Sequence, residues 1–198
     1  MKAILIIFLV AFTLCEKEKP VGGWEKRSFE ENSFEIDRSF KLAAEDYIKS
    51  NKLEEEEDVD DLIGLTVYSQ VVAGTNYKLT FMDRKAEFPV VHEYTIYVPL
   101  KTGNKNDKDL EITEHNEYQA DNGLVPLNDP LFETLENKLY KYLKGSKEEL
   151  QFISYVYPME NKETNFYKVN GYTSDGDHQY ILCQDKESEE FYSIHKIK

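Results

Sequence analysis

The chain has 198 residues, of which 40% are hydrophobic and 13% aromatic, so it holds enough apolar material for one or two domains of about 90 residues. Its formal net charge is −14 at neutral pH. This acidity argues against nucleic acids and anionic membranes as partners, because their phosphate groups would repel the protein.

The N-terminus predicts a secretory signal peptide over residues 1–15. Lys2 precedes an apolar run, residues 4–14, that is too short to span a bilayer. We therefore expect a secreted protein, or one delivered to a lysosome-like vacuole. Removal of this peptide would leave Cys183 as the only cysteine, so the mature chain would contain no intramolecular disulfide.

A short glycine-containing segment follows the signal peptide. Gly22 and Gly23 lie between Val21 and Trp24, and glycine gives the backbone unusual freedom to bend. The segment is either a hinged arm that carries Val21 to a partner or a linker, and its composition leaves both interpretations open.

A helix is predicted over residues 28–50. Ser28 with Glu31, or Asn32 with Glu35, has the spacing of a capping box. One apolar stripe at helical spacing would pack onto a sheet, and it consists of Ile36, Phe40, Ala43, Ala44 and Tyr47. The acidic run that follows, residues 54–61, is interpreted as a solvated loop because it lacks the spacing of an EF-hand calcium site.

Two antiparallel hairpins are predicted next. In the first, β-branched and aromatic residues run up to Val72, Gly74 supplies the turn, and alternating residues from Tyr77 onward form the returning strand. The second pairs residues 90–98 with residues 110–118. The first hairpin would carry an uncharged tip, although 31% of the chain is charged.

The tip resembles the first inhibitory hairpin of the cystatins, whose signature is Gln-x-Val-x-Gly. The matching residues here are Gln70, Val71, Val72, Ala73 and Gly74. Gly22-Gly23-Trp24 is similar to the N-terminal segment of plant cystatins. Pro99-Leu100 lies where cystatins carry their second loop, although the aromatic residue common there is missing. The resemblance covers residues 20–118 and implies an α+β fold with a long helix on an antiparallel sheet of four to five strands.

Residues 121–198 look like a second, degenerate copy of the same unit. Asp129 and Pro130 predict a helix start and Gly145 a helix stop. The predicted apolar stripe of this helix is Leu131, Leu135, Leu139, Tyr142 and Leu143. Strands at residues 152–157, 166–172, 179–184 and 190–197 would follow. The predicted organisation is therefore a signal peptide (1–15), a cystatin domain (16–120) and a degenerate cystatin-like domain (121–198).

The resemblance implies a reversible, competitive inhibitor of papain-like cysteine proteases that needs no cofactor or metal and acts as a monomer. The expected protease contacts are Gln70, Val71, Val72, Ala73, Gly74, Val21, Gly22, Gly23, Pro99 and Leu100. In the second copy the equivalent of the tip, residues 158–163, is charged and would be costly to desolvate in an apolar cleft.

Two other functions stay open on the sequence alone. The chain could be a secreted cystatin-fold binding protein without inhibitory activity, or a latexin-like inhibitor of another protease class. Catalysis is not expected: Cys183 with His178 or His195 would be the candidate pair, but Cys183 lies in an alternating strand and is predicted to be a packing residue.

Overall fold

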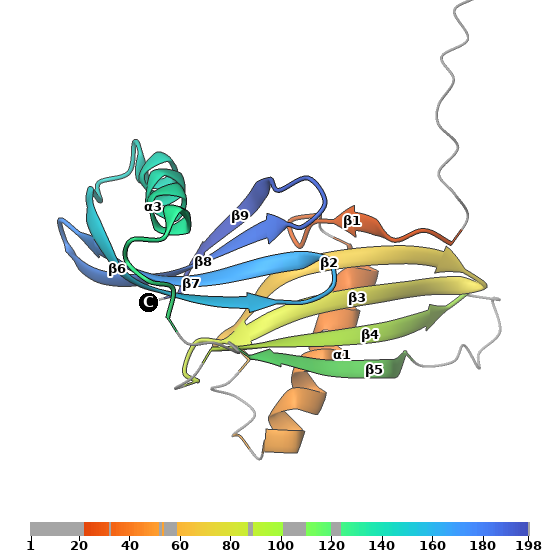
Figure 1. Ribbon diagram of the computed structural model, residues 1–198. Coiled ribbons are helices and arrows are strands. Elements are labelled where there is room, and N and C mark those ends of the chain that lie inside the picture. The colour runs from red at the N-terminus through yellow and green to blue at the C-terminus, as the bar shows by residue number, and fades with distance from the viewer. Residues whose placement is uncertain are drawn as a thin grey trace, which may run out of the picture.

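The computed structural model describes residues 22–31, 33–51, 53, 59–86, 89–100, 110–119 and 124–197. These residues form two antiparallel sheets, ordered β1-β2-β3-β4-β5 and β6-β7-β8-β9, and two helices (Figure 1). The elements are β1 (Glu25–Arg27), α1 (Phe34–Asn51), β2 (Leu62–Val72), β3 (Gly74–Asp83), β4 (Val90–Pro99), β5 (Glu111–Gln119), α3 (Pro130–Leu143), β6 (Leu150–Glu160), β7 (Thr164–Thr173), β8 (Gly176–Asp185) and β9 (Phe191–Lys196).

The elements stack in four layers, in the order α1, first sheet, second sheet, α3 (Figure 1). The side chains of a strand alternate between its two faces, so β4 directs Tyr94 toward α1 and Val91 toward the second sheet. The core between the sheets contains Ile63, Leu65, Met82 and Val91 from the first sheet and Met159, Phe166, Ile181, Cys183 and Ile197 from the second half of the chain.

The predicted fold of two cystatin-like domains, each a long helix on its own sheet, is wrong. Strands make up 51% of the structure and helices only 21%, and the helices have 18 and 14 residues. The physical reason is that the inner faces of the two sheets are apolar and bury one another. The molecule is therefore a sheet-on-sheet sandwich with a short helix on each outer face.

The stripe on α1 is confirmed, but the helix begins later than predicted. Ile36, Ala43, Ala44 and Tyr47 are buried and Phe40 packs beside them. Ser28 and Glu31 instead form a turn, in which the Ser28 backbone NH donates to Glu31 Oε1 over 3.1 Å. Ser33 caps the helix, since its Oγ accepts from the Ile36 backbone NH over 3.5 Å.

The predicted ends of α3 are confirmed, but its predicted apolar stripe is partly wrong. Asp129 caps the helix through its side chain and Pro130 opens it, and Gly145 follows its end with φ at +97°. Tyr142, predicted to be buried, is 49% exposed. Phe132 takes the buried place, because its spacing from Leu135 and Leu139 continues the stripe one turn earlier.

Several predicted features lie outside the described residues: the signal peptide, the acidic residues 54–58 and the boundary near residue 120. Neither α1 nor α3 is long and apolar enough to cross a membrane.

Candidate functional site

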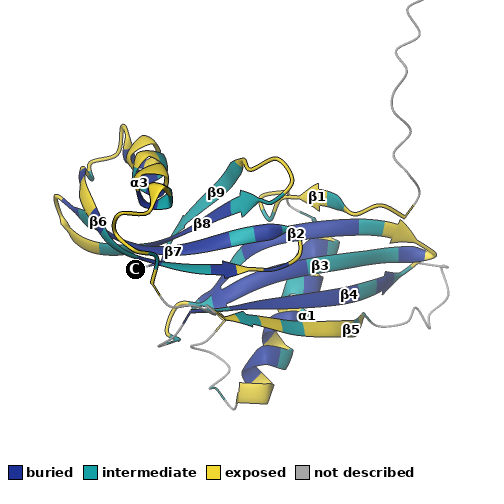
Figure 2. Ribbon diagram, viewed as in Figure 1, coloured by how far each residue is buried: buried dark blue, intermediate teal, exposed yellow. Residues whose placement is uncertain are grey.

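The hairpin of β2 and β3 ends in exposed apolar residues, as the sequence predicted. The strands pair from Leu62 and Asp83 up to Val72 and Gly74, with Ala73 at the turn. Val71 is 66% exposed and Val72 43% exposed, and Ala73 is exposed as well (Figure 2). We call Val71, Val72 and Ala73 the apolar tip.

Strand β4 holds the turn of this hairpin in place. Tyr97 Oη donates to the Ala73 carbonyl over 2.6 Å. Gly74 is buried, has φ at +154°, and approaches β4 so closely that a Cβ there would lie 2.6 Å from the Val98 carbonyl oxygen. The glycine is therefore required by close backbone packing, and the apolar tip has one supported conformation.

The N-terminal segment lies beside the tip. Strand β1 pairs with β2 so that Glu25 is opposite Ser69. Gln70 Nε2 donates to the Gly22 carbonyl oxygen, while Gln70 Oε1 accepts from Asn76 Nδ2 over 3.1 Å. Gln70 thus ties the N-terminal segment to the hairpin. Gly22 has φ at +94°, which fits its predicted role as a bend.

The end of β4 lies beside the same turn. Pro99 is in register with Gly74, and the following Leu100 is 66% exposed. Leu100 therefore adds a further exposed apolar side chain beside the tip. Residues 101–109, which would continue the second loop, lie outside the described residues.

Nine of the ten predicted site residues gather at this end of the first sheet, and Val21 lies outside the described residues. No protein-family model matches the chain, and no curated protein matches it. The supporting residues Tyr97 and Asn76 did not stand out in the sequence, because their contacts depend on strand register.

The charged loop of the second sheet has partners inside the molecule. Asn161 Nδ2 donates to Glu93 Oε2 over 2.7 Å, and Lys78 Nζ lies 2.9 Å from Glu163 Oε1. Both partners, Lys78 and Glu93, belong to the first sheet. The loop between β6 and β7 is therefore docked on that sheet, and its charges stabilise the contact between the two halves of the chain.

The candidate catalytic cysteine lies in the core between the sheets. Cys183 is completely buried, and burial raises the pKa of its thiol to about 12. The thiolate, which is the nucleophilic form, is therefore strongly disfavoured at neutral pH.

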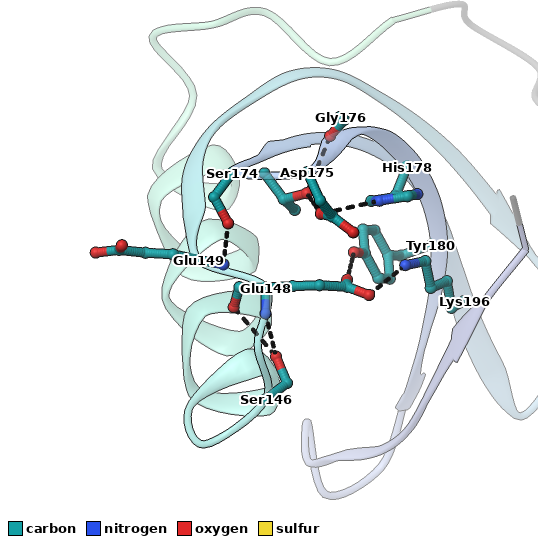
Figure 3. A network of polar contacts seen from close by, with 10 residues as sticks. Ser146, Glu148, Glu149, Ser174, Asp175, Gly176, His178, Tyr180 and Lys196 are labelled. Carbon is teal, nitrogen blue, oxygen red and sulfur yellow. Dashed lines mark hydrogen bonds and ion pairs between the residues drawn. The ribbon is translucent and has the colours of Figure 1, made fainter.

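A polar network at the other end of the molecule ties together the start of β6, the β7–β8 turn and β9 (Figure 3). Glu148 accepts from Lys196 Nζ over 2.6 Å and from Tyr180 Oη over 3.2 Å. Asp175 Oδ1 accepts from Thr173 Oγ1 and lies 3.2 Å from His178 Nε2. Glu148, Asp175 and His178 have the spacing of metal ligands, but these contacts already engage both oxygens of Glu148, so we interpret the network as structural.

Proposed function

We propose that this protein is a reversible inhibitor of papain-like cysteine proteases, which inserts the apolar tip into the active-site cleft. The observation that carries the proposal is the convergence of Gly22, the apolar tip and Leu100 at one end of the sheet. Exposed apolar side chains from two separate segments, the apolar tip and Leu100, are typical of an interaction surface. We also propose that the protein is secreted and acts as a monomer.

The apolar tip suits a narrow apolar groove. Val71 and Val72 are exposed in the free protein, so their transfer into a cleft removes apolar area from water. The turn is held by β4 through Tyr97. Little conformational entropy is then lost on docking, and preorganised surfaces of this kind bind tightly for their size.

The same support explains how such a tip resists cleavage. The Ala73 carbonyl oxygen accepts a hydrogen bond from Tyr97 Oη. Hydrolysis requires a substrate carbonyl to enter the oxyanion hole of the protease and to distort toward a tetrahedral intermediate. A carbonyl already held by Tyr97, in a turn packed against Val98, resists that distortion.

The test is titration of residues 16–198 against papain with a fluorogenic substrate, and we expect competitive inhibition. Val71→Asp and Val72→Asp should each weaken inhibition by at least about 100-fold, because an apolar groove would desolvate an unpaired carboxylate. Their melting temperatures should stay close to that of the wild type, since both side chains are exposed.

Leu127→Asp is the matched control, because Leu127 is 73% exposed and belongs to the segment before α3. It should inhibit like the wild type. If the wild type does not inhibit papain, or if the Leu127 and Val71 variants lose inhibition equally, the proposal is wrong.

A further inference from the structure

A cluster of two histidines and a glutamate lies on β4 and β5, in the half of these strands away from the apolar tip. The strand register places His92 opposite Glu117 and Tyr94 opposite His115. All three side chains lie on the face of the first sheet that α1 covers, since His92 stacks on Phe81 and contacts Tyr47. The potential ligand atoms all lie within 4.8 Å of one another.

Two distances in the cluster are close to those of a tetrahedral metal centre. His92 Nδ1 is 3.5 Å from Glu117 Oε1, and His115 Nε2 is 3.9 Å from the same oxygen. Zinc binds nitrogen and oxygen ligands at about 2.0–2.1 Å, so tetrahedral ligands are roughly 3.3 Å apart. Small rotations of His115 and Glu117, the two more exposed side chains, would close the difference.

The buried histidine supplies an independent sign of a missing ligand. The His92 side chain is 7% exposed, and its Nδ1 is buried without a hydrogen-bond partner among the described residues. A buried polar atom normally has a partner, because leaving it unsatisfied costs free energy.

We propose that His92 Nδ1, His115 Nε2 and Glu117 bind a divalent late transition-metal ion, with Zn²⁺ as the best match. Two imidazoles and a carboxylate suit zinc, whereas Mg²⁺ and Ca²⁺ prefer oxygen ligands alone. Aromatic rings pack against both imidazoles, since Phe81 stacks on His92 with ring centroids 5.5 Å apart and Tyr94 stacks on His115 with ring centroids 4.1 Å apart. A bound ion would clamp the edge strand β5 to β4.

This site is separate from the apolar tip. Pro99 lies seven positions after His92 along β4, and at strand spacing this is roughly 23 Å. Metal binding and protease inhibition can therefore succeed or fail independently.

Calorimetric titration of residues 16–198 with Zn²⁺ at neutral pH tests the proposal. The wild type should bind one ion, and Mg²⁺ should give no binding heat. His115→Gln and Glu117→Gln should each weaken zinc binding at least about tenfold. These two exposed side chains are chosen because replacing the buried His92 could disturb folding. Zinc should raise the melting temperature of the wild type more than that of either variant.

His178→Gln is the matched control, because His178 belongs to the rival cluster with Glu148 and Asp175. It should bind zinc like the wild type. The Co²⁺ form should give the intense visible absorption of a tetrahedral nitrogen and oxygen site, lost in His115→Gln. Absence of zinc binding by the wild type, or loss of binding in His178→Gln with retention in His115→Gln, would overturn the proposal.

Discussion

Asn161 Nδ2 donates a hydrogen bond to Glu93 Oε2 over 2.7 Å, and this pair joins the two sheets. Both residues are 4% exposed. The other carboxylate oxygen of Glu93 accepts from Tyr118 Oη over 3.1 Å, and Asn161 Oδ1 accepts from the backbone NH groups of Glu163 and Thr164. Each side chain is satisfied only while the β6–β7 loop is docked on the first sheet, so the pair fixes how the two halves of the chain meet.

Replacing Asn161 should therefore destabilise the whole molecule. Asn161→Asp brings a second carboxylate to Glu93 in a buried site, and we expect the free energy of unfolding at neutral pH to fall by about 3–5 kcal/mol. Asn161→Ala should cost less, about 1–3 kcal/mol, because it only removes a partner. Urea unfolding measures both. Lys162→Ala, at the exposed neighbouring position, is the control, and an equal loss in all three variants would contradict this account.

Gly74 should tolerate no side chain. The Cβ of Gly74→Ala would meet the Val98 backbone carbonyl at 2.6 Å, whereas Gly145, also at positive φ, has open space around it. We expect Gly145→Ala to cost about 1 kcal/mol from backbone strain alone, and Gly74→Ala to cost clearly more. Thermal unfolding of the two variants compares them. Equal melting temperatures would mean that the turn can move away from β4.

The first half of the chain should not be stable as a separate monomer. In residues 16–120 the inner-face residues Ile63, Leu65, Met82 and Val91, all 8% exposed or less, lose the second sheet that covers them. An uncovered apolar sheet face drives association, so size-exclusion chromatography with light scattering should show oligomers. A monomeric fragment that melts at the same temperature as residues 16–198 would show that the sheets are energetically independent.

The local structure of this chain could be predicted well from its sequence. Alternation from Tyr77 to Phe81 and the glycine at position 74 predicted the first hairpin, because strand periodicity and turn chemistry act over a few residues. Asp129, Pro130 and Gly145 predicted the ends of α3 for the same reason.

Stacking of the two sheets was not predicted from the sequence. From Leu65 to Ser69 every residue of β2 is buried, and a strand without exposed residues is typical of a sheet covered on both faces. A helix can cover only one face of such a sheet. What lies on the other face depends on residues far apart in sequence, such as Met82 and Phe166, which belong to one core cluster. Periodicity does not encode that association.

In the candidate site, too, the local pattern was predictable and the long-range contacts were not. The residues of the apolar tip could be found by their pattern, whereas the bond from Gln70 to Gly22 required the β1–β2 register. The cluster of His92, His115 and Glu117 was invisible for the same reason, since no short motif joins its members and only the β4–β5 pairing brings them together.

Stability should depend on pH through His195. Burial lowers its pKa, and the nearby Glu30 only partly offsets this effect; Lys26 and Arg27 are on the same side of the molecule. The native state then holds His195 neutral, while the unfolded chain binds a proton below about pH 6.5. The free energy of unfolding should therefore fall as the pH decreases through about 6.5.

His195→Gln removes this proton and should flatten the dependence, measured by urea unfolding at several pH values. Glu30→Gln should steepen it, because the carboxylate that favours the charged imidazole is lost. A His195→Gln variant with the full wild-type slope would mean that other groups cause the pH dependence.

Gln70 holds Gly22, which belongs to the N-terminal arm (residues 20–23), beside the apolar tip. If Val21 enters a protease subsite, a chain that begins at Trp24 loses one buried apolar side chain. That loss is worth about 1.5–3 kcal/mol, or roughly ten- to a hundredfold in the inhibition constant. It should appear mainly in the dissociation rate, because removing a packed contact shortens residence more than it slows encounter.

Gln70→Ala distinguishes the contribution of the arm from the contribution of its bond to Gln70. In the full-length protein it frees the arm, which must then be ordered on binding, so inhibition should weaken, but less than on deletion. In the chain that begins at Trp24 the bond to Gly22 is already absent, and only the contact from Gln70 to Asn76 is lost. The effect of Gln70→Ala should therefore be smaller in the truncated chain, and the difference in this double-mutant cycle measures the attachment. Equal inhibition of papain by the full and truncated chains would reduce residues 20–23 to a linker, and inhibition would then depend on the apolar tip and Leu100.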